Sequence, residues 1–273
     1  MTDEERYLFD LQGYLVIDDV LKPDELDDLN HLLDDYDLWA EPREQDRFFD
    51  CWKNDEHQIT RGPLHRFSRP FRQLIGHPRI IPYLTDLLGR QFRYDHGHAM
   101  LMRKGGGPFG LHGGAVPWHP GIRYEVAEGQ IRSELLVVEY ALCDVDERDG
   151  GFCVLPGSHK SNFPCPSSFA AFEKTGPWLR HVQQKAGSAV IFTEALTHGT
   201  LPWTADHERR ALFYRYTPGY MAFVGRYRED KQEEADGGYP RPSHSAEDDW
   251  RPEERRILEA PYLWNRADSF PKN

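Results

Sequence analysis

Apolar residues recur at helical spacing in three stretches of the first ninety residues. Thr2 and Glu5 have the spacing of a capping box, which predicts a short helix that ends at Gly13. A second helix is predicted from Pro23, a residue suited to a first helical turn, and a third over residues 78–88. The buried faces of the second and third helices are expected to consist of Leu26, Leu29, Leu32, Leu33, Ile81, Leu84, Leu87 and Leu88.

The pattern changes after Gly89 to short β-prone runs separated by Gly- and Pro-rich turns. The expected strands cover residues 91–103, 133–142, 152–155, 188–192 and 211–216, and one short β-prone run precedes them at 14–18. Many short strands with frequent turns favour a mainly β fold of the sandwich or barrel type.

The chain is expected to form one domain over residues 1–273. Its helical N-terminal part, about residues 1–89, should pack on a β core of about residues 90–220. The polar, aperiodic stretch from Trp39 to Pro70 is interpreted as surface loops. The polar, Pro-rich stretch of about residues 225–273 is interpreted as an extension or lid.

Composition narrows the possible partners. Lysine and arginine number 33 against 45 acidic residues, a net charge of −12, which disfavours binding to nucleic acid or to an anionic membrane. No apolar run approaches the roughly 20 residues of a membrane span, and the acidic first residues differ from a signal peptide. The four cysteines lack CxxC spacing, which is typical of free thiols in a reducing compartment. We therefore expect a cytoplasmic protein whose partner is a small molecule.

Three positions are suited to iron chemistry. His112 follows a Gly-rich turn, His198 ends a buried apolar run, and Arg209 lies eleven residues farther on. A mononuclear Fe(II) oxygenase binds its metal through two imidazoles and usually one carboxylate, which leaves positions open for a cosubstrate and O2. A 2-oxoglutarate cosubstrate also requires a fixed cation, and the planar fork of arginine binds carboxylates bidentately.

These residues, together with the segment GGFCVLPGSHK at 150–160 and the run Gly13–Ile17, resemble the phytanoyl-CoA dioxygenase family of Fe(II)/2-oxoglutarate-dependent oxygenases. The resemblance covers about residues 8–220. It implies a double-stranded β-helix (jelly-roll or cupin-like) core, a distal metal ligand at His198 and a cosubstrate anchor at Arg209. It also implies that Fe(II), 2-oxoglutarate and O2 serve to hydroxylate a small molecule, with release of succinate and CO2.

The sequence departs from the family at the proximal His-x-Asp motif, where it reads His112-Gly113-Gly114. Three consequences are open. A halide can occupy the position vacated at Gly114, as in the related halogenases that carry glycine or alanine there. Another carboxylate can take the place of the aspartate. Alternatively, the metal site is lost and the protein is a non-catalytic jelly roll that binds a small molecule.

Two carboxylates are candidates for the third metal ligand. Glu194 stands four residues before His198, and Glu134 lies in an apolar run where an unpaired carboxylate is costly to bury. Glu139 is expected to face an ion-pair partner instead. His96 and His98 share one face of a predicted strand, and they are the alternative source of a missing ligand.

Overall fold

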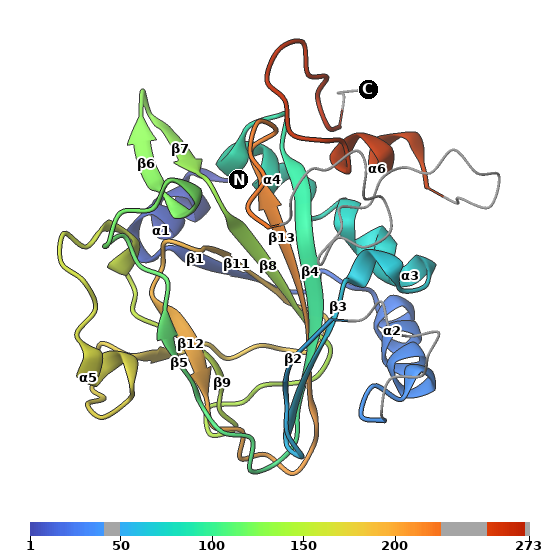
Figure 1. The fold of residues 1–273 in the computed structure, drawn as a ribbon, viewed down its shortest axis with the longest axis vertical. Helices are drawn as coiled ribbons and strands as arrows, with labels where there is room; N and C mark the ends of the chain where they lie inside the picture. Colours follow the sequence, from blue (N-terminus) through green and yellow to red (C-terminus); the bar gives the residue numbers. More distant parts are fainter. Residues whose placement is uncertain (41–49, 225–249, 271–273) are drawn as a thin grey trace.

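Two antiparallel sheets face each other in the computed structural model, which describes residues 1–40, 50–224 and 250–270 (Figure 1). The large sheet has the order β1 (Tyr14–Ile17), β11 (Ala189–Thr193), β8 (Leu136–Ala141), β13 (Arg209–Thr217), β4 (Arg93–Met102), β3 (Gln58–Gly62) and β2 (Asp50–Asn54). The small sheet has the order β10 (Arg180–His181), β9 (Gly151–Val154), β12 (His198–Leu201) and β5 (Phe109–His112). The predicted double-stranded β-helix core is confirmed.

The helices lie mainly on the outer face of the large sheet, opposite the small sheet (Figure 1). They are α1 (Asp3–Gln12), α2 (Pro23–Tyr36), α3 (Arg69–Gln73), α4 (Ile81–Leu88), α5 (Ser167–Ala170) and α6 (Pro252–Ile257). The capping box of Thr2 and Glu5 is present, and Gly13 ends α1 in the left-handed conformation with φ 87°. The helix predicted over residues 78–88 is α4, and it begins at Ile81 rather than at residue 78, because Pro82 occupies its first turn.

Tyrosines of the large sheet bind the helical layer. The Tyr214 hydroxyl donates to the Phe71 carbonyl at 2.8 Å, and the Tyr216 hydroxyl donates to Ile75 at 3.0 Å. Tyr140 donates in the same way to Leu74 at 3.0 Å. A buried hydroxyl is costly unless it is hydrogen-bonded. These bonds therefore act together with the apolar packing to hold the helices against the sheet.

One apolar cluster packs between the large sheet and the helices, and a second fills the space between the two sheets. Both sheets contribute to it, and its members are Tyr14, Val137, Phe152, Val154, Val182, Val190, Phe192, Leu196, Ala211 and Phe213. Alternation along β13 explains the division: Leu212 and Tyr214 face the helices, whereas Ala211 and Phe213 face the barrel interior.

The prediction of loops over residues 39–70 was wrong for the part that the structure describes. β2 and β3 form a hairpin there, and β3 pairs with β4 so that Ile59 lies opposite Leu101. Polar residues of β3 such as Gln58 and Thr60 are buried, so the strand lacks the apolar alternation that would have revealed it. Residues 41–49 lie outside the described residues.

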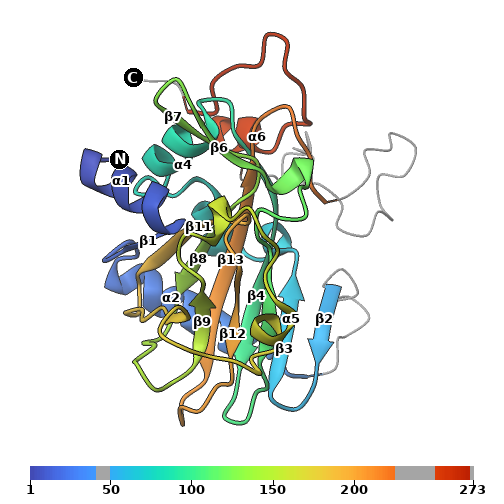
Figure 2. The same ribbon diagram turned by 90° about the vertical axis from the view of Figure 1, so that its left-hand side faces the viewer.

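The predicted strand over residues 133–142 is two strands. β7 (Gln130–Ser133) pairs with β6 (Tyr124–Ala127) in a small hairpin that packs beside α4 (Figure 2). β8 begins only at Leu136, and in the break the Leu135 carbonyl accepts a hydrogen bond from the amide of Glu194. This bond brings the end of β11 to the start of β8.

Residues 250–270 pack back onto the body of the protein. The buried Glu254 of α6 forms an ion pair with Arg69 of α3 at 2.7 Å, and Phe270 stacks on Phe92. This part of the predicted extension is therefore an ordered wrap, and residues 225–249 lie outside the described residues. Among the described helices, none has the length and apolar character required to cross a membrane.

Candidate metal centre

His112 and His198 are neighbours across the small sheet. His112 ends β5, His198 begins β12, and the two are opposite each other in the antiparallel register. Side chains of directly opposed residues project from the same face of a sheet. Their ring centroids are accordingly 4.2 Å apart. The structure thus brings the two predicted imidazoles together on the inner face of the barrel.

Backbone carbonyls set the orientation of both rings. Nδ1 of His198 lies 2.7 Å from the Leu196 carbonyl, and Nδ1 of His112 lies 3.1 Å from the Gly110 carbonyl. A carbonyl only accepts hydrogen bonds, so each Nδ1 carries the proton and donates it. The lone pair of each ring is therefore on Nε2, the arrangement of a histidine prepared to bind a metal.

Glu194 completes a group of three side chains that could hold a metal ion. It follows β11 directly, and its Oε1 lies 3.8 Å from Nε2 of His198. One ligand atom from each of His112, Glu194 and His198 lies within 4.8 Å of the others. Oε2 of Glu194 is buried without a hydrogen-bond partner among the described residues. A buried carboxylate oxygen that lacks a partner beside two imidazole lone pairs fits a bound divalent cation.

The electrostatics of the group favour the charge states that metal binding requires. Burial, and then the neighbouring His112, lowers the pKa of His198 to about 4. Burial by itself would raise the pKa of Glu194, but the electrostatic interactions of its carboxylate with His198 and Arg215 outweigh burial and lower that pKa. At neutral pH the group therefore offers a neutral imidazole and an ionised carboxylate.

Backbone conformation and close contacts explain why glycine occupies both positions after His112. A Cβ on Gly113, which has φ +74°, would lie 2.6 Å from the Glu194 carbonyl oxygen. A Cβ on Gly114, which has φ +103°, would lie 2.9 Å from Oγ1 of Thr197. The end of β5 thus packs directly on the turn between β11 and β12, with a backbone that side-chain-bearing residues rarely adopt. The turn between β11 and β12 leaves little room for a side chain at Gly114, and Glu194 belongs to this same turn.

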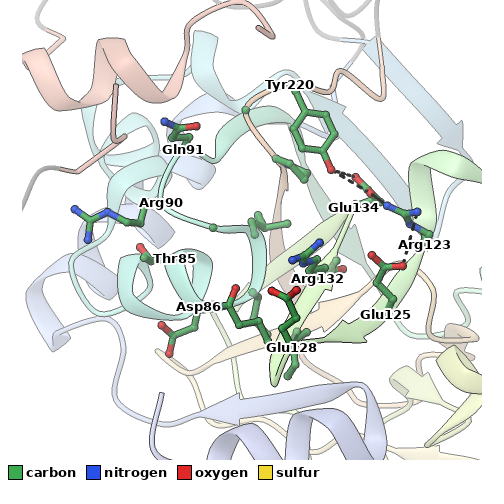
Figure 3. A pocket seen from close by; sticks show the side chains of 18 of the residues that line it. Thr85, Asp86, Arg90, Gln91, Arg123, Glu125, Glu128, Arg132, Glu134 and Tyr220 are labelled. Atoms are coloured by element: carbon green, nitrogen blue, oxygen red, sulfur yellow. Dashed lines mark hydrogen bonds and ion pairs between the residues drawn. The ribbon is translucent and has the colours of Figure 1, made fainter. Parts of the chain in front are cut away.

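The other candidate ligand, Glu134, lies away from the histidines. Its carboxylate accepts a hydrogen bond from Arg123 at 2.7 Å and contacts the Tyr220 hydroxyl at 3.1–3.2 Å (Figure 3). All three residues line a pocket of about 1090 Å³ next to α4 and the β6–β7 hairpin, and none of the three clustered ligands lines it. Of the two carboxylates, only Glu194 is placed beside the imidazoles.

Arg209 is buried inside the barrel at the start of β13. One guanidinium nitrogen, Nη2, lies 2.6 Å from Oε1 of Glu139, so Glu139 does face an ion-pair partner as predicted. Nη1 lies 3.5 Å from the sulfurs of Met100 and Met102. Nε of Arg209 and Oε2 of Glu139 are both buried without a partner among the described residues.

Sequence reasoning missed Arg215, which also faces the barrel interior. Nη1 of Arg215 lies 3.2 Å from Nδ1 of His98, and its charge contributes to the low pKa of Glu194. The signal was available in the twofold periodicity of a strand. Arg215 lies six positions after Arg209, an even offset, so both project from one face of β13.

Comparison with known proteins identifies the family of this chain. The family model described as phytanoyl-CoA dioxygenase matches residues 9–211, about three quarters of the chain. The chain belongs to the phytanoyl-CoA dioxygenase family. Ectoine dioxygenase of Streptomyces anulatus is 26% identical over 166 residues, which cover 57% of this chain and 52% of that protein. Ectoine dioxygenase of Streptomyces coelicolor is 24% identical over 157 residues, with 57% and 50% covered. The chain therefore spans about half the length of these curated relatives.

Solved structures share the fold of this phytanoyl-CoA dioxygenase family member. HygX from Streptomyces hygroscopicus, determined with nickel, 2-oxoglutarate and hygromycin B bound, superposes with a TM-score of 0.69 at 23% identity. The superposition covers 81% of this chain and 89% of HygX. EctD from S. alaskensis in its apoform superposes with a TM-score of 0.60 at 20% identity, covering 80% and 78% of the two chains. At these identities the likeness establishes the fold alone.

Proposed function

We propose that this protein is an Fe(II)- and 2-oxoglutarate-dependent oxygenase that hydroxylates a small molecule and releases succinate and CO2. The observation that carries the proposal is the group of His112, Glu194 and His198, whose ligand atoms lie within 4.8 Å of one another inside the barrel. Two imidazoles and one carboxylate on one side of a cation match the ligand set of non-haem Fe(II) oxygenases. The family assignment, reached separately from the sequence, supports the same chemistry.

In this proposal the three side chains hold Fe(II), which supplies the activation of O2 for attack on a substrate C–H bond. The protein positions the ligands and excludes water. Hydrogen bonds to the Gly110 and Leu196 carbonyls prevent the two imidazoles from rotating. Phe192 and Phe152 lie against His198, with ring centroids 4.8 Å and 5.9 Å away, and form an apolar wall behind the site.

Arg209 is the proposed anchor for the distal carboxylate of 2-oxoglutarate. Its eleven-residue separation from His198 is the spacing that the family resemblance implies. Its side chain packs over Gly151, where a Cβ would lie 3.2 Å from Nε, and Gly151 pairs with Leu201 three residues along β12 from His198. The buried Nε donor, which lacks a partner among the described residues, is available to a carboxylate oxygen.

The position of Glu194 favours oxygenation over the halogenation alternative. Halogenation requires the coordination position opened by the missing aspartate to stay free for a halide. Glu194 places a carboxylate oxygen beside His112 and His198, where it can fill that coordination position. The glycine at position 114 is explained by its backbone conformation and by the contact that a side chain would make with Thr197. A glycine in this motif is therefore no argument for a bound halide in this protein.

The test is an anaerobic titration of the purified protein with Fe(II) and then with 2-oxoglutarate. Binding of one Fe(II) and the appearance of the visible charge-transfer band of a chelated 2-oxo acid are expected. Admission of O2 should then convert 2-oxoglutarate to succinate. His198→Ala should abolish all three signals, whereas His31→Ala, at an exposed position on α2, should leave them unchanged. A wild-type protein that binds neither Fe(II) nor 2-oxoglutarate would instead support a non-catalytic jelly roll.

A further inference from the structure

Arg215 is a cation of the barrel interior that lacks a charged partner among the described residues. Its Nη1 lies 3.2 Å from Nδ1 of His98, and its guanidinium carbon lies 5.9 Å from the centroid of the Phe213 ring. Arg209, on the same face of the same strand, has the carboxylate of Glu139 at 2.6 Å. The two arginines of β13 thus differ in one respect: Arg209 is neutralised and Arg215 is not.

His98 does not compensate the charge of Arg215. Burial, followed by the nearby Arg215, holds the pKa of His98 well below its ordinary value. The ring is therefore neutral and accepts a hydrogen bond from Arg215 at Nδ1. Burial also lowers the pKa of Arg215 itself, since the charged guanidinium has lost much of its hydration. A desolvated charge without a counter-ion is unfavourable, and proteins rarely keep one unless a ligand pairs with it.

The surroundings of Arg215 contain accessible surface. Most inward-facing residues of β4 and β13 are buried, but the apolar Met100 and the polar His96 and Arg215 are only partly so, as is Glu194. His96 is held by Asp95, whose Oδ1 lies 2.8 Å from its Nδ1, so its Nε2 is left for another contact. The partly exposed polar groups of the barrel interior are therefore gathered around Arg215 and Glu194.

Charge balance indicates what belongs in that space. A divalent cation bound by Glu194 and two neutral imidazoles retains one net positive charge. Arg215 contributes a second, and the pair of Arg209 and Glu139 contributes none. Anionic groups of a ligand are needed to neutralise a site of this kind in a low-dielectric interior.

We propose that Arg215, oriented by His98, binds a carboxylate group of a ligand that occupies the barrel beside the metal centre. The proposal rests on the proposed function and adds a second anion-binding residue to it. Guanidinium and carboxylate form short, charge-assisted hydrogen bonds, which suits a partly buried guanidinium that has no ion-pair partner among the described residues. The carboxylate belongs either to 2-oxoglutarate or to the primary substrate, and two titrations distinguish these sources.

The first titration adds 2-oxoglutarate to Ni(II)-loaded protein and measures heat, so that no turnover is required. Arg215→Met retains the length and the apolar part of the side chain but removes the charge, and Arg215→Lys restores a point charge. If the cosubstrate is the source, Arg215→Met should weaken 2-oxoglutarate binding by about tenfold or more, and Arg215→Lys should recover part of the loss. Arg132→Met, at an exposed position on β7, is the matched control for charge removal.

The second titration adds sodium acetate, and in parallel acetamide, to protein loaded with Ni(II) and saturated with 2-oxoglutarate. If the primary substrate is the source, wild type should bind acetate but not acetamide, and Arg215→Met should lose acetate binding while its affinity for 2-oxoglutarate stays unchanged. Thermal unfolding and metal content, measured for every variant, establish that each is folded and loaded.

Identical behaviour of Arg215→Met and wild type in both titrations would overturn the proposal. This outcome differs from failure of the proposed function, in which wild type itself binds no Ni(II) and no 2-oxoglutarate. In that case the acetate titration of metal-free protein still compares Arg215→Met with wild type, and equal heats would reject the carboxylate site.

Discussion

Oε1 of Glu194 lies 3.8 Å from Nε2 of His198, although Glu194 belongs to the turn after β11 and His198 begins β12, so that no helix brings them together. The turn is closed by hydrogen bonds from the Leu196 amide to the Thr193 carbonyl and from the Ala195 amide to Oγ1 of Thr193. It places a carboxylate and an imidazole from one short segment on the same side of the barrel interior. This turn thus places a carboxylate beside the two histidines, whereas the His-x-Asp motif implied by the family resemblance would supply one from the residues after His112.

Glu194→Gln should weaken divalent metal binding by about tenfold or more, because an amide oxygen lacks the negative charge that the carboxylate contributes to the cation. Competition with a chromogenic chelator for Ni(II) measures the change. Glu134→Gln is the matched control, since Glu134 is bonded to Arg123 and Tyr220 and should not alter metal affinity. Equal affinities of Glu194→Gln and wild type would remove Glu194 from the ligand set.

Gly114→Asp should not improve the metal site, although it restores the family's His-x-Asp motif. Its backbone φ of +103° and the contact of an added Cβ with Oγ1 of Thr197 at 2.9 Å make any side chain strained there. We expect Gly114→Ala to lower the free energy of unfolding by about 1–3 kcal/mol. Urea denaturation measures it, and Gly107→Ala, where an added Cβ meets nothing within 4 Å, should cost far less. Tighter metal binding by Gly114→Asp would contradict this interpretation.

Glu139→Gln should destabilise the protein strongly, because it leaves the guanidinium of Arg209 buried without its counter-charge. Removal of one member of a buried ion pair typically costs about 3–5 kcal/mol. The double variant Arg209→Met, Glu139→Gln should regain a large part of the loss, since it no longer buries an unpaired charge. Denaturant unfolding of both single variants and the double variant gives the coupling energy. Additive effects would show that the pair does not interact.

His159 should make the protein less stable in mild acid. Burial lowers the pKa of His159 to about 4 in the folded protein, and its Nε2 donates to the Asp10 carbonyl. The unfolded chain has the ordinary pKa near 6.5, so between the two values it binds the proton that the folded state refuses. The stability that depends on this histidine is therefore full above about pH 6.5 and falls as the pH decreases toward 4, by about 2 kcal/mol at pH 5.

His159→Gln should reduce this pH dependence in metal-free protein, as measured by urea unfolding at pH 7.5 and pH 5. The remaining slope comes from other buried histidines with a lowered pKa, such as His198 and His98. His31→Gln, which removes an exposed imidazole, is the control and should retain the wild-type slope. A wild-type slope in His159→Gln would mean that another group binds the proton.

Local features of the sequence determined much of the fold. The capping box at Thr2, the stop at Gly13 and the helical stripe after Pro23 predicted α1 and α2, because these signals act within a few residues of chain. The apolar runs that became β4, β8, β9, β11 and β13 were also recognisable. The strand at Gln58–Gly62 was not, since its pairing with β4 and the burial of its polar side chains depend on residues far away in the chain.

The sequence by itself also named two imidazoles and one arginine, because their spacing resembles that of a known family. Only the tertiary structure placed Glu194, and not Glu134, beside the two imidazoles, and only it revealed that Arg209 is neutralised by Glu139 while Arg215 is not. The physical reason is that ligation and charge compensation act through space at a few ångströms. The partners come from strands that are distant in the chain, and their distances are fixed by sheet register and by the faces on which side chains emerge.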